Sequence, residues 1–130
     1  MRWIILIGDE NFNLETIKRT EHYGSVDTYA IEKTAGRYCV DFGKNHILYD
    51  LNNNYDEFEE DIKKVPFKNP TIITATYTEK ECIRKVLLQE NFPKNIYIDN
   101  DFGLIVPLKD YIRMGMPLDK EDMTGISIDM

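Results

Sequence analysis

The sequence has few of the features that mark disulfide-stabilised, exported or membrane-spanning proteins. Only two cysteines, Cys39 and Cys82, occur among its 130 residues, and each lies in an apolar stretch. We expect both to be buried, because a chain of this length can form a core without a disulfide or a metal. The apolar run from Trp3 to Ile7 has five residues. Signal peptides need a longer apolar segment and membrane helices need roughly 20 residues, so we expect a cytoplasmic protein.

A surplus of positive charge is also missing. The chain carries 16 lysines and arginines against 23 aspartates and glutamates, which gives a formal net charge of −7 at pH 7. Nucleic-acid binding requires basic residues gathered on one face, whereas those of this chain are scattered among acidic ones. We therefore expect no nucleic-acid partner. An acidic surface favours solubility and fast association with a basic protein.

The sequence contains no motif for catalysis or for cofactor binding. His22 and His46 lie 24 residues apart, without a neighbouring cysteine or histidine, so neither has the spacing of a metal ligand. Ser25 and Ser127 lack the context of a catalytic nucleophile, and no glycine-rich loop is present to hold a phosphate. We predict no catalytic residue, metal or cofactor, and we interpret His22 as a favourable partner for a helix dipole.

Strand-like and helix-like patterns alternate along the chain. Short apolar runs predict strands over 2–7, 25–31, 38–42, 47–49, 71–76, 95–98 and 104–106. Amphipathic patterns predict helices from an Asn13 cap to Gly24, over 55–65, after a Thr78–Glu81 capping box, and from Pro107 to near Gly115. Together they indicate a single α/β or α+β domain over 1–130, with a mixed β-sheet packed against about four helices.

Four residues carry the clearest core signal. Ile5 and Ile73 lie in the two most apolar predicted strands, and Val86 and Leu87 share the apolar face of the helix after Thr78. We expect all four side chains to be buried.

The helix over 55–65 has acidic residues in its N-terminal half and an Asn54 cap, which suits the helix dipole.

Polar side chains follow three of the predicted strands. In an open α/β sheet, ligands bind beyond the carboxyl ends of the strands, so these loops are expected to line one crevice. Its acidic residues favour a cation, an amine or a basic side chain. The Asp99–Asp101 segment also has the composition of a turn in which aspartate and asparagine side chains bond backbone amides, and we favour that interpretation over a metal site. The candidate binding residues are Asp9, Glu10, Asn11, Tyr77, Asp99 and Asp101.

The C-terminal segment 117–130 divides into two parts. Residues 117–125 have the composition of a loose polar connector. In 126–130, Ile126, Ile128 and Met130 alternate with polar residues, which predicts a short edge strand. We expect this strand to dock on its own sheet or on a neighbouring subunit, and the second arrangement would give a homodimer.

Small size, acidity and missing catalytic motifs favour a non-enzymatic protein-binding domain, for example an immunity or inhibitor-type protein for a basic partner. The alternative is a small enzyme or metal-dependent domain that uses a carboxylate cluster of Asp9, Glu10, Asp99 and Asp101. That alternative requires the four carboxylates to converge. A structural or regulatory subunit is a third hypothesis.

Overall fold

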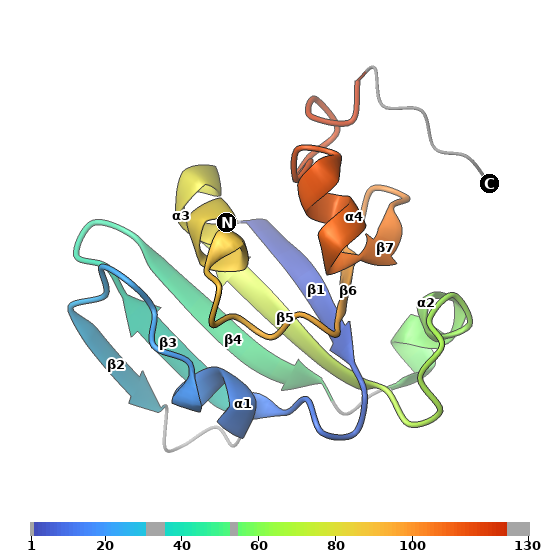
Figure 1. Cartoon of the computed structure of the whole chain (residues 1–130), viewed down its shortest axis with the longest axis horizontal. Coiled ribbons are helices and arrows are strands. Elements are labelled where there is room, and N and C mark those ends of the chain that lie inside the picture. The colour runs from blue at the N-terminus through green and yellow to red at the C-terminus, as the bar shows by residue number, and fades with distance from the viewer. Residues whose placement is uncertain (1, 31–35, 53–54, 125–130) are drawn as a thin grey trace.

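The computed structural model describes residues 2–30, 36–52 and 55–124. In chain order its elements are β1 (Arg2–Gly8), α1 (Leu14–Arg19), β2 (Asp27–Ala30), β3 (Arg37–Asp41), β4 (His46–Asn52), the 3-10 helix η1 (Tyr55–Phe58), α2 (Glu59–Ile62), β5 (Thr71–Tyr77), α3 (Lys80–Leu88), β6 (Tyr97–Asp99), β7 (Ile105–Pro107) and α4 (Leu108–Arg113) (Figure 1). The predicted order of strands and helices and the single α+β domain are confirmed. No helix in these ranges is long and apolar enough to cross a membrane.

The seven strands form one sheet in the order β2-β3-β4-β5-β1-β6-β7. We expected a mixed sheet, but each pairing between described strands is antiparallel. β5 and β6 point in the same direction, and α3 connects them as in a β-α-β unit. They do not pair with each other because β1 lies between them and runs opposite to both.

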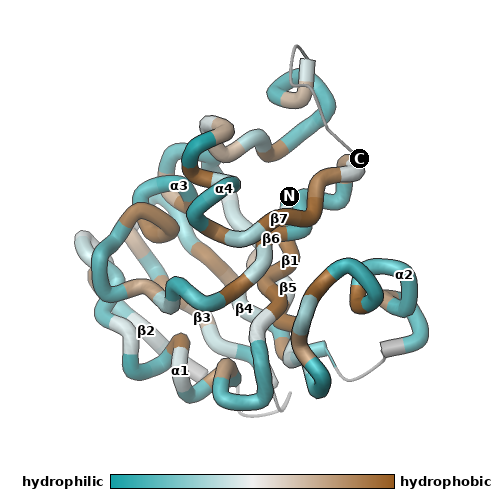
Figure 2. Tube along the Cα trace, turned by 45° about the vertical axis from the view of Figure 1, so that its right-hand side comes forward, coloured by the Kyte–Doolittle hydropathy of each residue, from teal (hydrophilic) through white to brown (hydrophobic). Residues whose placement is uncertain are grey.

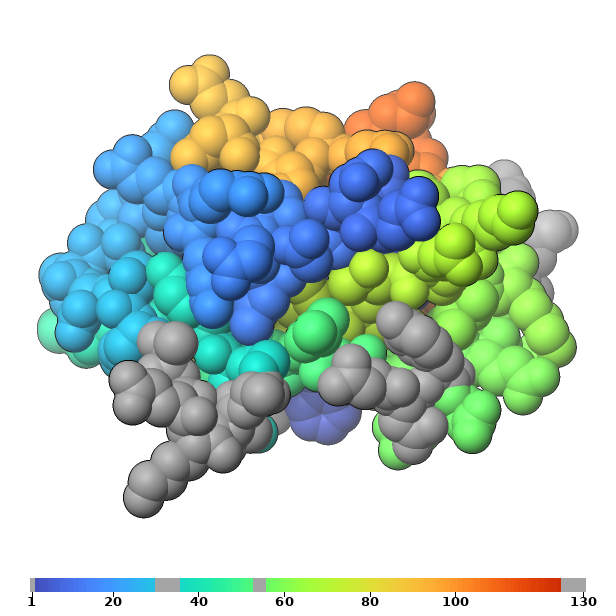
Figure 3. All heavy atoms as spheres, turned by 90° about the horizontal axis from the view of Figure 1, so that it is seen from below, coloured from blue at the N-terminus to red at the C-terminus, as the bar shows by residue number. Residues whose placement is uncertain are grey.

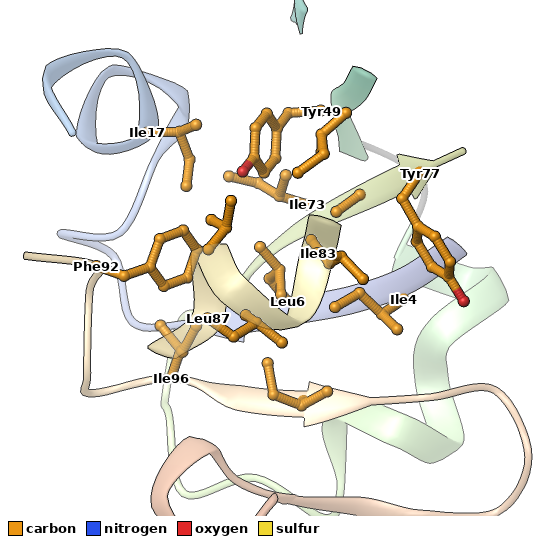
Figure 4. Packing of buried hydrophobic residues seen from close by; sticks show 14 of the residues in the cluster. Ile4, Leu6, Ile17, Tyr49, Ile73, Tyr77, Ile83, Leu87, Phe92 and Ile96 are labelled. Carbon is orange, nitrogen blue, oxygen red and sulfur yellow. The ribbon is translucent and has the colours of Figure 1, made fainter. Parts of the chain in front are cut away.

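The helices cover the two faces of the sheet unequally. Apolar residues of α1, α3 and α4 join the main core on one face (Figures 1 and 4). On the other face, which we call the underside, Phe58 and Ile62 pack on a smaller cluster around Ile5, Ile7 and Ile72. β1 is therefore buried on both faces, and hydrophobic residues concentrate along the central strands (Figure 2). This explains why its sequence is a continuous apolar run.

The first helix begins as predicted but ends earlier. The Asn13 side chain accepts a hydrogen bond from the backbone N–H of Thr16, at 3.1 Å, and the Thr16 hydroxyl completes a capping box. α1 ends at Arg19 because Thr20 adopts an extended conformation, so the expected stop at Gly24 is wrong. Gly24 instead serves a turn at φ 84°, where glycine carries no steric penalty.

The capping box expected at Thr78–Glu81 does not form. α3 begins at Lys80, and its cap residue Glu79 makes no side-chain capping bond. The Thr78 hydroxyl instead accepts from the backbone N–H of His46 and donates to Asn45, which ties the turn before β4 to the end of β5. The Asn54 cap lies outside the described residues. The helix expected over 55–65 is a turn of 3-10 helix followed by the short α2.

The predicted core residues are confirmed. Ile5, Ile73, Val86 and Leu87 are each at most 4% exposed. Cys39 is buried and Cys82 is half-buried, and both are free thiols.

Leu87→Ala is expected to lower the free energy of unfolding by about 2–5 kcal/mol, because it removes a fully buried side chain from the face of α3 that meets the sheet. Urea denaturation measures the change. The matched control is Leu88→Ala, since Leu88 is the next residue of the same helix and is 53% exposed. A loss below about 0.5 kcal/mol at position 87 would contradict the burial described here.

Candidate functional site

The six sequence-predicted site residues fall at two opposite ends of the sheet. Arg2 at the start of β1 pairs with Tyr77 at the end of β5, and Gly8 at the end of β1 pairs with Thr71 at the start of β5. Ile5 pairs with Asp99 at the end of β6. The loop after β1 is therefore at one end, and the loops after β5 and β6 are at the other. The expectation that all three line one crevice is wrong, because it assumed parallel neighbours for β1.

Asp9, Glu10 and Asn11 form a surface loop next to the segment that precedes β5 (Figure 3). The Asp9 carboxylate accepts a hydrogen bond from the backbone N–H of Asn11 at 2.8 Å, and Glu10 accepts one from the Asn69 side chain at 3.5 Å. These residues do not meet Asp99 or Asp101, so the carboxylate-cluster alternative loses the convergence on which it depends. Within the described ranges, no group of three or more His, Cys, Asp or Glu residues is placed to hold a metal ion.

The Asp99–Asp101 segment is a turn built by side-chain bonds to the backbone, as the favoured interpretation predicts. Asp99 accepts from the backbone N–H of Asp101 at 2.8 Å, and Asn100 accepts from those of Phe102 and Leu104 at 3.0 and 3.3 Å. Asp101 has a φ of 64°, a conformation that aspartate and asparagine tolerate. The carboxylates of Asp99 and Asp101 therefore lie in different environments.

Asp99 faces the underside of the sheet, where it lies against α2. It is 3% exposed. The pKa of Asp99 is raised to about 7, mainly by burial and also by a hydrogen bond with the Asp61 side chain, while the bond from the Asp101 N–H acts in the opposite direction. Asp99 therefore keeps its proton to a higher pH than an exposed aspartate does.

The segment 117–124 differs from the loose connector that we expected. Leu118 is 1% exposed and belongs to the main core. The carbonyl oxygen of Pro117 accepts hydrogen bonds from the Asn100 side chain at 3.0 Å and from the Tyr111 hydroxyl at 2.7 Å. The segment is therefore fixed to the turn after β6 and to α4. The predicted edge strand 126–130 lies outside the described residues.

Ion pairs attach the same segment to the start of β1 and to α3. Asp119 lies 2.8 Å from Arg2 and 2.6 Å from Lys80, and Asp122 lies 2.9 Å from Arg84. The hydrogen bond from Lys80 lowers the pKa of Asp119. The sequence did not predict these ion pairs, because alternating acidic and basic residues are also typical of a solvated loop.

Beside this segment, Trp3 and Phe102 line a pocket of 440 Å³. Their side chains are 46% and 47% exposed, so two aromatic rings are accessible at the same hollow. Leu118 contributes an apolar wall. The charged residues around the pocket are Arg2, Asp101, Asp119, Lys120 and Glu121. We call this hollow the Trp3–Phe102 pocket.

Of the predicted site residues, only Asp101 lines the Trp3–Phe102 pocket. Sequence reasoning missed the two aromatic residues. Trp3 belongs to an apolar run that predicts a buried strand, and Phe102 belongs to a turn. Neither position therefore indicated a pocket. The antiparallel ladder between β1 and β6 brings them together, since it places the start of β1 next to the turn after β6.

Tyr77 lines a separate hollow of 630 Å³, together with Arg2, Lys80 and Arg84. The ring is 1% exposed, and its oxygen points away from the neighbouring core side chains (Figure 4). Burial raises the pKa of Tyr77. No described residue accepts or donates a hydrogen bond at this hydroxyl. Because the three cations are already paired with Asp119, Asp122 or Glu81, we assign no ligand to this hollow.

His22 is a core residue rather than a partner for the dipole of α1. Its Nδ1 donates to the carbonyl oxygen of Thr20 at 2.9 Å, and its Nε2 accepts from the Tyr49 hydroxyl at 2.7 Å. Burial lowers the pKa of His22. With both nitrogens occupied and 3% exposure, the ring is closed to a substrate.

Comparisons with known proteins give no relative for this chain. No protein-family model matches the sequence, no curated protein is significantly similar to it, and no solved structure matches its fold. The geometry of the described residues is therefore the basis for inferring a function.

Asn100→Asp is expected to lower the free energy of unfolding by about 1–3 kcal/mol, because a carboxylate would face the Pro117 carbonyl without a proton to donate. The variant keeps the oxygen that accepts from Phe102 and Leu104. Urea denaturation measures the loss, and NMR spectra should show shifted amide signals for Leu118 and Asp122. Asn95→Asp at an exposed position is the control. Unchanged stability and spectra would show that Asn100 does not hold the segment.

Proposed function

We propose that this chain is a non-enzymatic protein-binding domain that binds a basic partner by receiving an arginine side chain in the Trp3–Phe102 pocket. The observation that carries this proposal is the pair of half-exposed aromatic rings at one hollow with a carboxylate beside them. A guanidinium group stacks on aromatic rings and forms hydrogen bonds with carboxylates. The aliphatic part of an arginine side chain can also pack against the apolar side chain of Leu118.

The charges around the pocket support a cationic guest. Three carboxylates and two cations surround it. Arg2 is already paired with Asp119 at 2.8 Å, so the other charged groups that line the pocket are the carboxylates of Asp101 and Glu121 and the cation of Lys120. The net charge of −7 would steer a basic protein toward this surface. An inhibitor or immunity-type protein acts in this way, because it needs only affinity and no chemistry of its own.

A titration with short peptides tests the proposal. The probe is a capped Gly-Gly-Arg-Gly-Gly peptide, and the reporter is the indole N–H signal of Trp3, the only tryptophan of the chain. We expect saturable binding with a Kd on the order of 1 mM, which corresponds to about −4 kcal/mol. A citrulline peptide, which keeps the shape but lacks the charge, should not bind.

Variants locate the binding site. Trp3→Ala should weaken the arginine peptide about 5- to 30-fold, as expected for the loss of about 1–2 kcal/mol of cation–π interaction, with binding followed by calorimetry. Asp101→Asn, which the turn tolerates, should weaken it up to about fivefold. Tyr29→Ala is the matched control, because Tyr29 is a 48% exposed aromatic residue on the far edge strand β2. Equal binding of the arginine and citrulline peptides would overturn the proposal.

A further inference from the structure

Arg2 lines both hollows at this end of the sheet, the Trp3–Phe102 pocket and the hollow beside Tyr77. Its side chain is 58% exposed, and one guanidinium nitrogen lies 2.8 Å from a carboxylate oxygen of Asp119. Asp119 also lines the Trp3–Phe102 pocket. The pocket is therefore bordered by an arginine–carboxylate pair of the same chemistry that the proposed arginine guest would form.

Asp119 has other partners besides Arg2. The ammonium group of Lys80 lies 2.6 Å from the same oxygen, Oδ2, and the other oxygen, Oδ1, accepts from the backbone N–H of Asp122 at 2.8 Å. These contacts would keep the Asp119 carboxylate charged and in place if Arg2 moved away. Losing the Arg2 pair would itself have a small effect on stability, because an ion pair with an exposed partner contributes little.

The hollow beside Tyr77 offers Arg2 a second position. Arg2 on β1 and Tyr77 on β5 are paired in register, so their side chains lie on the same face of the sheet. The hollow has a volume of 630 Å³. No described residue forms a hydrogen bond with the buried Tyr77 hydroxyl, and a guanidinium N–H would supply a donor for its oxygen. An Arg2 side chain that leaves Asp119 therefore has both space and a hydrogen-bond acceptor nearby.

We propose that Arg2 is a resident guanidinium at the Trp3–Phe102 pocket, and that a guest arginine binds by taking its place at Asp119. This inference rests on the proposed function, because the guest is the arginine side chain proposed there. Exchanging one guanidinium for another keeps a charge-assisted pair at Asp119. Arg2 and Trp3 are consecutive residues of β1, so their side chains point to opposite faces of the sheet, and Arg2 leaves the Trp3 ring free for the guest.

The resident guanidinium has a direct consequence for affinity. A site that is competent to bind only part of the time has an apparent affinity reduced by that fraction. As long as Arg2 occupies Asp119, a guest gains the aromatic rings but not the carboxylate. Arg2 therefore weakens the binding of an arginine guest, and its removal strengthens it.

Arg2→Gln removes the resident guanidinium and tests the exchange. We expect the variant to bind the capped Gly-Gly-Arg-Gly-Gly peptide about two- to fivefold more tightly than the wild type does, which is the effect of one exposed ion pair. The Trp3 indole N–H signal measures the affinity. The matched control is Arg37→Gln, which changes the net charge equally at a 42% exposed arginine that pairs with Asp50, and should leave the affinity unchanged.

Asp119→Asn identifies the carboxylate that changes partner. The asparagine keeps an oxygen that accepts from the backbone N–H of Asp122. In the Arg2→Gln background it should cancel the gain in affinity, whereas in the wild-type background it should have little effect, because the guest then loses a partner that it shared with Arg2. In the wild type, saturating peptide should also shift the Nε–H signal of Arg2.

The outcomes separate the exchange from the proposed function. If the arginine peptide binds neither the wild type nor Arg2→Gln, both are overturned. If it binds the wild type but Arg2→Gln leaves the affinity unchanged or lowers it, the exchange alone is overturned. An equal gain in Arg37→Gln, or a gain in Arg2→Gln that persists with Asp119→Asn, would overturn it as well. Binding to Arg2→Gln but not to the wild type would support it.

Discussion

β1 must be covered on both of its faces and paired on both of its edges, and the rest of the structure is arranged around that requirement. Its residues Ile4 and Leu6 enter the main core, while Ile5 and Ile7 enter the cluster on the underside. A strand of this kind is stable only in the interior of a sheet, between two other layers. β5 and β6 supply the neighbours, α3 with the other main-face helices supplies one cover, and α2 supplies the other.

The position of β1 also decides which polar residues meet. Because β5 and β6 are antiparallel to it, the loop with Asp9 and Glu10 is carried away from the loops that follow β5 and β6. The same geometry brings the opposite end of β1 beside the turn after β6. Trp3 and Phe102 thereby come to share a pocket, and Arg2 can reach Asp119 in the C-terminal segment.

The acidic residues of this chain have three different structural roles, which the net charge does not distinguish. Glu59 and Glu60 of α2 are largely exposed and form only surface pairs with Lys63, which contribute little to stability. Asp119 and Asp122 fix the C-terminal segment by ion pairs with residues of β1 and α3. Asp99 is buried against another carboxyl group and has a raised pKa. The sign of the charge is common to all of them, whereas burial and partners determine what each one does.

The sequence by itself determined the order of the elements, the Asn13 cap and the burial of Ile5, Ile73, Val86 and Leu87. These features depend on residues that are close in the chain or on a periodic apolar pattern, so local physics is sufficient to predict them. Only the tertiary structure decided that β1 lies between β5 and β6, that 117–124 is docked, and that His22 meets Tyr49 across 27 positions of the chain. The same distinction between local and tertiary information applies to the candidate site. The turn at Asp99–Asp101 could be predicted from its composition, but its proximity to Trp3 could not, because strand order arises from competition among distant apolar segments for the same core and leaves no local signal in the chain.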